Sequence, residues 1–398
     1  YFVAKEFIAY TQDRIKNGTA KQIEKEYIST IENKFMPFFS SYIITAITQQ
    51  TVESYVAMRK ETISRSRQNT EQASWNALMR YAVNNKFLLT EIDFVKTKVS
   101  KAKLRLSFTK TQQAKVRQAL TTNANTLSKN KTTNEIRLLL NDYYYLLLHS
   151  AIRVGLEIMR VRYTSFEYIK ISELDSTQQK FFAEADEDEY LLCYLKENET
   201  KTNDSRNVII RTATRAFENA LLRLASRTEN SCDIYNKHFK KNKLKTDANK
   251  RACLKDLFKN CDEYVVRLGS EVGVNKLNEA EQLKRMTRLS EQTSKAFNKL
   301  LKEIDLYKDK QNNTRSLYSI RHTYATEMLE QTSNLILVAQ QVGNSPIVLD
   351  KFYNKAQAKT QADAFVGIAE QLKYEASSKQ EKADAKKLLL QMLKELES

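Results

Sequence analysis

The sequence has 398 residues and carries 65 Lys or Arg against 48 Asp or Glu, which gives a formal net charge of +17. This excess favours a polyanionic partner, nucleic acid before an anionic membrane surface, and the length allows two or three domains. The longest apolar stretch, 143–152, is about half of the ~20 residues that span a bilayer, so we expect no membrane partner.

Cysteine and histidine usage argues against a disulfide framework and against a metal site. The four cysteines include no pair at the C-x-x-C spacing, and the chain has three histidines. We therefore expect a reducing compartment, the cytoplasm of a bacterium or the host of a phage, and chemistry without a metal or another cofactor. No basic and apolar leader opens the sequence, which begins at Tyr1.

The first third of the chain predicts helices. Six glycines and two prolines in the whole sequence favour a mostly helical fold with a small sheet. Asn17-Gly18 predicts the end of a first helix, a second helix runs to about Asn33, and a loop follows around Pro37. Further helices are expected from Thr48 to about Arg59 and over about 66–84. Together they predict a four-helix N-terminal domain at 1–98.

A basic stretch without acidic residues follows this predicted domain. A solvated surface strand would have the same composition, but the position between two domains favours an extended linker at 99–109 that follows DNA phosphates. Six cations lie in this linker and directly beside it. They are Lys96, Lys98, Lys101, Lys103, Arg105 and Lys110.

The remaining residues, 110–398, predict a second domain of mixed α/β type. The apolar spacing from Ile136 to Leu147 predicts a core helix that ends shortly before Arg153. Three β-rich segments, at 166–171, 190–195 and 207–211, predict a small sheet. The polar run 197–206 joins the last two segments as a hairpin.

Two later segments are predicted to be helical. The stretch at about 226–314 is polar and basic, with nine Lys or Arg against three Asp within 231–260, and we interpret it as a basic helical insertion. The closing stretch, about 375–397, carries Leu389, Met392, Leu393 and Leu396 on one face of a final helix.

The most informative motif lies near the end of the chain. Residues 318–326 are Tyr-Ser-Ile-Arg-His-Thr-Tyr-Ala-Thr, residues 342–345 are Val-Gly-Asn-Ser, and Phe352-Tyr353 follow. The motif resembles the second-arginine and nucleophile boxes of the tyrosine recombinases, the phage-integrase family. In that family the tyrosine follows nine residues after the variable position of the turn, and Tyr353 follows Asn344 by nine.

Two earlier segments resemble the same family. Ser-Ala-Ile-Arg-Val-Gly at 150–155 is similar to its first-arginine box, usually Thr-Gly-Leu-Arg, a small residue and Glu, although Glu157 comes one place late. Thr-Lys-Thr at 200–202 resembles the hairpin loop with the catalytic lysine, so Lys201 is the first candidate and Lys196 the second. Residues 1–95 resemble the family's helical core-binding domain.

The resemblance implies a role for each residue. Arg153 and Arg321 would hold the scissile phosphate with their planar forks, Tyr353 would attack phosphorus, and Lys201 would protonate the departing 5′-oxygen. Many relatives have His or Lys at the position of Tyr318, and His or Trp at that of Asn344. Both side chains can still hydrogen-bond a phosphate oxygen.

The resemblance also implies a C-shaped clamp, in which a helical SAM-like core-binding domain and the catalytic domain close around duplex DNA. Arg65 and Arg67 join the cations of the linker as candidate DNA contacts. We expect a dimer on each site, a homotetramer on paired sites, and accessory proteins that bend DNA or set direction. The expected function is integration and excision of a mobile element through a 3′-phosphotyrosyl intermediate, without metal or ATP.

Two other interpretations stay open. The looser box around Arg153 and the missing histidines fit a DNA-binding accessory protein on a decayed recombinase scaffold. Resolution of chromosome dimers is a second alternative within the enzyme class, against which the long predicted insertion and the box at Tyr318 argue.

Overall fold

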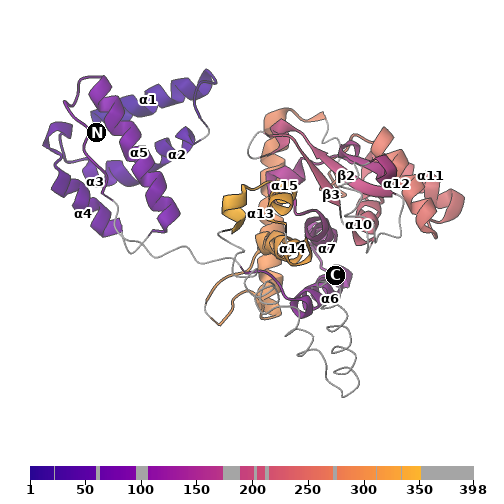
Figure 1. Ribbon diagram of the computed structural model, residues 1–398. Coiled ribbons are helices and arrows are strands. Elements are labelled where there is room, and N and C mark those ends of the chain that lie inside the picture. The colour runs from indigo at the N-terminus through magenta and orange to yellow at the C-terminus, as the bar shows by residue number, and fades with distance from the viewer. Residues whose placement is uncertain are drawn as a thin grey trace, which may run out of the picture. The chain divides into compact units, whose positions relative to one another are not determined.

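A computed structural model describes residues 1–21, 23–59, 63–95, 106–173, 189–200, 204–210, 215–271, 276–310, 312–332 and 334–350. The chain divides into two compact units, Tyr1–Lys103 and Leu104–Ser398. Helices make up most of both units, and the second also holds a three-stranded sheet (Figure 1). The predicted fold class, mostly helical with a small sheet, is confirmed.

The N-terminal unit is helical in all its regular elements that the structure describes. Its α-helices are α1 (Phe2–Lys16), α2 (Glu24–Thr30), α3 (Met36–Phe39), α4 (Gln49–Arg59) and α5 (Arg65–Asn84), and Ile44–Ala46 forms a short 3-10 helix before α4. The predicted loop around Pro37 is wrong, because a π-helical turn, Ile31–Phe35, carries α2 directly into α3. Pro37 is the second residue of α3, which directly follows this π-helical turn.

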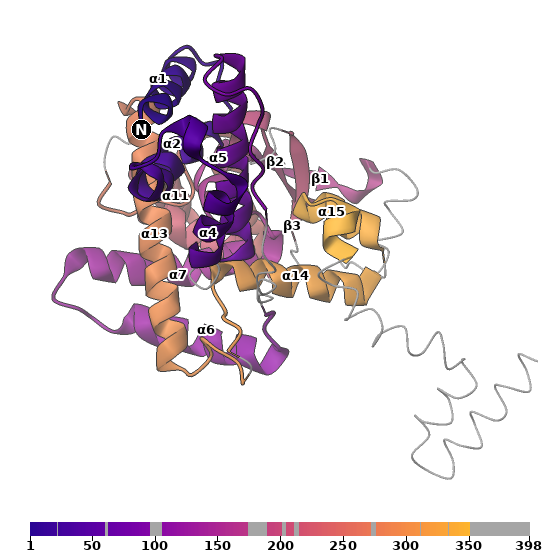
Figure 2. The ribbon, with the colours of Figure 1, turned by 90° about the vertical axis from the view of Figure 1, so that its left-hand side faces the viewer.

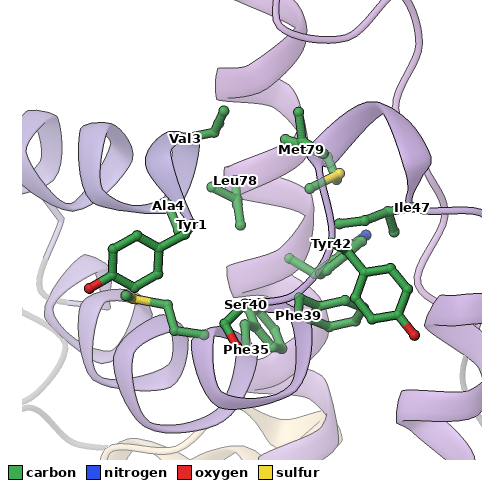
Figure 3. A pocket seen from close by; sticks show the side chains of 13 residues that line it. Tyr1, Val3, Ala4, Phe35, Phe39, Ser40, Tyr42, Ile47, Leu78 and Met79 are labelled. Carbon is green, nitrogen blue, oxygen red and sulfur yellow. The ribbon is translucent and has the colours of Figure 1, made fainter.

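Aromatic rings fill the core of this unit. Phe35 meets Tyr55 and Trp75 edge-on, with ring centroids 5.5 Å apart in both pairs, and the indole N–H of Trp75 donates to Ile92 O at 2.7 Å. Figure 3 shows a small apolar pocket beside these rings, with Met79 on its wall. Its volume of about 40 Å³ has room for roughly one water molecule, so we interpret it as a packing gap.

Among the residues that the structure describes, the second unit contains the other α-helices and three strands. They are α6 (Lys110–Asn125), α7 (Lys131–Ser150), α8 (Leu156–Met159), β1 (Phe166–Lys170), β2 (Glu189–Leu195), β3 (Arg206–Ile210), α10 (Ala216–Ala225), α11 (Glu229–Asn242), α12 (Asp247–Asn260), α13 (Glu279–Glu303), α14 (Leu317–Thr332) and α15 (Leu335–Val342).

Helix α7 is the central element of this unit. It packs against α6, α10, α13 and α14, and α13 crosses it at a steep angle (Figure 2). Asn130 caps its start by accepting a hydrogen bond from the Thr133 N–H at 3.1 Å. Leu139, Tyr143 and Leu147 are buried at helical spacing along it, and the helix ends at Ala151, which has left-handed backbone angles.

The sheet is antiparallel, with the strand order β1-β2-β3. Tyr168 pairs with Leu191 across the first ladder, and Cys193 pairs with Val208 across the second. The strands coincide with the three predicted segments to within one residue at each end. β3 is an edge strand of this sheet, and α15 packs against it (Figure 1).

The stretch 226–314, expected as a basic insertion, contains α11, α12 and α13. Leu254 and Leu257 of α12 and Phe297 and Leu301 of α13 are buried in the same hydrophobic core as α7. This stretch therefore contributes side chains to the core of the second unit. In the part of the chain that the structure describes, no helix combines the length and apolar character that crossing a bilayer requires.

Met79→Ala should lower the free energy of unfolding of the N-terminal unit by about 2–5 kcal/mol, because it removes a buried side chain from a packed core. Met58→Ala is the matched control: Met58 is 54% exposed and Met79 1%, so the control should change stability by less than about 0.5 kcal/mol. Trp75 is the only Trp of the chain, so its fluorescence during urea unfolding reports this unit. Equal shifts for the two variants would contradict the described packing.

Candidate active site

Arg321 lies in α14 with its guanidinium group enclosed by the protein. The residue is 2% exposed. One terminal nitrogen donates to the carbonyl of Ala151 and the other to that of Val342. The second nitrogen also meets Asn344 Oδ1 at 3.2 Å. Arg321 thus joins the end of α7 to the turn that follows α15.

Ala151 occupies the position at which the first-arginine box usually has glycine. Its φ of 53° lies in the left-handed region, which costs a non-glycine residue about 1–2 kcal/mol. The turn directs the Ala151 carbonyl to Arg321 and leads the chain on to Arg153. The substitution therefore keeps the conformation that glycine would adopt more easily.

Arg153 lies beside the same turn. One of its terminal nitrogens donates to Glu157 Oε2 at 2.9 Å, and the other donates to the carbonyl of Gly343. Glu157 Oε1 also accepts from the Arg153 backbone N–H at 3.2 Å. Gly155 has a φ of 103°, which an L-residue rarely adopts. This turn lets Glu157 reach Arg153 although it stands one place late in the sequence.

A third arginine, Arg206, belongs to the same cluster and was not among the predicted site residues. It opens β3 and donates to Glu157 Oε1. A Cβ atom at position 343 would collide with its guanidinium group unless that side chain shifted, and the φ of 63° at Gly343 also favours glycine. We call Arg153, Arg206, Arg321 and Glu157 the arginine cluster.

The arginine cluster contains more positive than negative charge. Three guanidinium groups face one carboxylate, and the side chains of Arg153, Arg206 and Glu157 are 12%, 12% and 3% exposed. Burial opposes ionisation of Glu157, but Arg206 and Arg153 outweigh it and lower the pKa of that carboxyl. Burial, with help from the neighbouring arginines, lowers the pKa of Arg321 to about 10. Arg321 is therefore still a cation near pH 7.

The turn after α15 brings Asn344 to this cluster. Asn334 caps the start of α15 by accepting from the Leu337 N–H at 3.0 Å, and Gly343 ends the helix in a left-handed conformation. The Asn344 N–H then donates to Ala339 O at 3.0 Å. These bonds fix the turn from both sides, so the Asn344 side chain is held beside Arg321.

Tyr318 lies one turn before Arg321 on α14. Its ring meets the ring of His322 edge-on, with centroids 5.1 Å apart, and its phenol interacts electrostatically with Arg321, which raises the pKa of that arginine against the effect of burial. The structure therefore brings Arg153, Arg321, Tyr318 and Asn344 into one site. Of the described residues, no group of three or more His, Cys, Asp or Glu could hold a metal ion.

The other predicted site residues fall into two groups. Lys201 and Tyr353 lie outside the described residues, as do the predicted final helix and five linker cations, Lys96, Lys98, Lys101, Lys103 and Arg105. Arg65 and Arg67 lie in the N-terminal unit, and Arg65 is exposed. Arg67 forms contacts inside that unit, with Glu26 at 3.6 Å and Glu71 at 3.7 Å.

The arrangement is chemically suited to an oxyanion. Buried guanidinium groups that repel one another are stabilised when an anion enters, and their planar forks match the oxygens of a phosphate. Glu157 orients two of the three groups but balances only one charge. A phosphodiester bound here would meet donors that are already in place, which is the condition for electrostatic stabilisation of a reaction.

Comparison with known proteins reveals similarity in structure. No protein-family model matches the sequence, and no curated protein matches it. A lambda integrase dimer bound to a COC′ core site is 12% identical, with 88% of this chain and 76% of that chain covered and a TM-score of 0.51. A lambda integrase fragment on such a site is 14% identical, with 88% and 94% covered and a TM-score of 0.50. The Tn1549 transposon integrase, in complex with circular intermediate DNA, is 12% identical, with 91% and 99% covered and a TM-score of 0.50. This chain has the tyrosine recombinase fold of these integrase structures, as its motifs predicted.

Glu157→Gln should destabilise the second unit by about 3–5 kcal/mol at pH 7, because it leaves buried guanidinium groups without their anionic partner. The loss should shrink in acid. The folded pKa of Glu157 lies below its ordinary value of 4.5, so its stabilisation is present above that value and is lost as the pH falls through the folded pKa.

Urea unfolding followed by circular dichroism at pH 7 and at about pH 3 measures both effects. Glu330→Gln removes an exposed carboxylate of α14 and serves as the matched control, with a change within about 0.5 kcal/mol. A loss for Glu157→Gln that is the same at both pH values would show that the carboxylate charge does not stabilise the cluster.

Proposed function

We propose that this chain is a tyrosine recombinase, an enzyme that cuts and rejoins DNA at specific sites through a 3′-phosphotyrosyl intermediate. The observation that carries the proposal is the arginine cluster. In this cluster Arg153 and Arg206 both donate to Glu157, and Arg321 is held by neutral acceptors, so that three guanidinium groups are accompanied by one carboxylate. The fold and the spacing of the motifs agree with it. The lambda and Tn1549 integrases of the same fold were solved on DNA.

In the proposed reaction, Arg153 and Arg321 hold the non-bridging oxygens of the scissile phosphate. Negative charge on these oxygens grows as phosphorus becomes pentacoordinate, so donors that are fixed in advance favour the transition state over the bound substrate. Asn344 and Tyr318 stand beside Arg321 and would each hydrogen-bond the phosphate or orient the arginine that does.

Tyr353 is the proposed nucleophile and Lys201 the proposed acid, with Lys196 as the second candidate. A bond forms between the phenolic oxygen and phosphorus as the phenol releases its proton to solvent water, and the bond from phosphorus to the 5′-oxygen breaks as the lysine donates a proton to that oxygen. The phosphotyrosyl bond conserves the energy of the phosphodiester, so the reverse attack by a 5′-hydroxyl rejoins the strands. No step requires ATP or a metal.

Duplex DNA is the proposed partner, and the net charge of +17 supports it. We propose that residues 1–98 and 110–398 form the two halves of a clamp joined by the basic linker, that two copies occupy each site and that four assemble on paired sites. Arg65 and the linker cations would contact phosphates. The proposed biology is integration and excision of a mobile element.

Tyr353→Phe should abolish the covalent protein–DNA species while leaving DNA affinity nearly unchanged, because only the nucleophilic oxygen is removed. The substrate is a nicked suicide duplex, from which the cleaved end diffuses away so that the covalent species accumulates. The reaction is run in EDTA and is followed by denaturing electrophoresis, with binding measured on the same duplex. Tyr374→Phe, which removes another tyrosine hydroxyl from the C-terminal residues, should retain the covalent yield.

The same assay separates the enzyme from a DNA-binding accessory protein on this fold. An accessory protein would bind the duplex but form no covalent species even as the wild type. Equal covalent yield from wild type and Tyr353→Phe would instead rule out this tyrosine as the nucleophile.

Changing Lys98, Lys101 and Lys103 together to Ala should weaken DNA binding without changing its specificity. Each lysine–phosphate pair removed on B-form DNA reduces the slope of log affinity against log salt by about 0.9, so the triple variant should flatten it by roughly 2 to 3 units. Phosphate contacts position a protein and base contacts specify the sequence, so discrimination between cognate and scrambled duplexes should be kept. Salt titrations on both duplexes provide the measurement, and coincident slopes would favour a solvated strand.

A further inference from the structure

Gln341 lies near the end of α15 and makes three hydrogen bonds with its side-chain amide. Its Oε1 accepts from the Ile209 N–H at 3.1 Å, and its Nε2 donates to Ile209 O at 2.6 Å. Nε2 also donates to the hydroxyl of Tyr324 at 3.0 Å. A primary amide has two N–H donors, and in Gln341 both are used.

The two bonds to Ile209 reproduce one rung of a β-ladder. Ile209 belongs to β3, the edge strand, and sits opposite Leu192 of β2. Because Gln341 reaches both its N–H and its carbonyl, these groups face away from β2, where a fourth strand would pair. The Gln341 amide takes the place of that strand for a single residue.

Gln341 lies in a helix face that is otherwise apolar. Val338 lies three residues before Gln341 and Val342 one residue after it, and both are buried. A leucine at 341 would make this helix face continuously apolar. The adjacent Gln340 is exposed. Packing alone therefore does not explain a glutamine at 341, whereas the unpaired polar groups of the strand edge do.

The three bonds join α15 to β3 and α14, the two elements that contain Arg206 and Arg321 of the arginine cluster. Ile209 follows Arg206 by three residues on β3, and Tyr324 follows Arg321 by three residues on α14. Gln341 itself precedes Gly343, whose carbonyl accepts from Arg153, by two residues. The amide thus fixes β3, which contains Arg206, and α14, which contains Arg321, relative to the turn at Gly343, which Arg153 contacts.

We propose that Gln341 is a positioning residue for phosphate cleavage, which sets the distance between the arginines and the turn that contains Asn344. It touches no substrate and acts through β3 and α14. This inference rests on the proposed recombinase function. Misplacement of catalytic groups by about 1 Å can cost about a hundredfold in rate, so the amide should matter for cleavage much more than for DNA binding.

The test compares Gln341→Leu with Gln340→Leu, the same substitution at the exposed neighbour. Gln341→Leu should slow formation of the covalent species by about ten- to a hundredfold with DNA affinity nearly unchanged, and Gln340→Leu should behave as wild type. Gln341→Glu keeps the acceptor for the Ile209 N–H but loses both donors. Gln341→Glu should therefore also slow formation of the covalent species. If Gln341→Leu does not fold, Gln341→Glu replaces it in the comparison with Gln340→Leu.

A substrate without charge distinguishes positioning from general damage. A methylphosphonate at the scissile position lacks the negative non-bridging oxygen, so misplaced arginines cost less there, and the defect of Gln341→Leu should shrink to within about threefold. If the substitution only reduced the fraction of folded, active protein, the rate would fall by the same factor on the phosphodiester and on the methylphosphonate. Equal factors, or a wild-type rate for Gln341→Leu, would overturn the proposal.

Hydrogen exchange provides a readout that does not depend on activity. Peptides covering β3 should exchange faster in Gln341→Leu than in Gln340→Leu. The substitution removes the two hydrogen bonds by which the Gln341 side chain holds the main chain of Ile209. Unchanged exchange would refute the bridge itself. If the wild type forms no covalent species on any duplex, the recombinase proposal fails, and the exchange result still decides whether Gln341 holds β3.

Discussion

Burying the guanidinium group of Arg321 requires two helices, α7 and α15, to end beside it. A cation removed from water costs several kcal/mol unless acceptors surround it, and the acceptors here are main-chain carbonyls at the ends of α7 and α15 together with Asn344. A carbonyl is free to accept in this way only where a helix stops. The left-handed residues that end α7 and α15, Ala151 and Gly343, are therefore consequences of one buried charge.

The same constraint explains why the site is positive before any ligand enters. Main-chain carbonyls orient Arg153 and Arg321 without neutralising them, and Glu157 neutralises one charge while it holds two guanidinium groups. If each arginine were paired with its own carboxylate, the guanidinium groups would be equally well oriented. An incoming phosphate would then have to compete with those carboxylates. Orientation by neutral acceptors leaves the electrostatic attraction available to the ligand.

Two kinds of feature could be predicted from the sequence: elements with a regular apolar spacing, and site residues within a motif of fixed spacing. The strands and α7 follow from periodicity, and the site at Arg321 from the resemblance. Arg206 was missed because a charged residue beside a polar loop is usually solvated, although the alternation of β3 places it on the same face as Val208 and Ile210, both buried. Gln341 interrupts an apolar helical stripe, which was the available signal. The helical turn at Pro37 depends on tertiary packing and leaves no local pattern.

The rung that Gln341 supplies also bears on how the protein behaves at high concentration. An edge strand with free N–H and carbonyl groups invites pairing with the same strand of another molecule, which is a common route to aggregation. β3 is short, begins with Arg206, and has the outward polar groups of Ile209 occupied by the protein itself. The sheet therefore offers little template for self-association at this edge, even though several copies of the chain are proposed to gather on one piece of DNA.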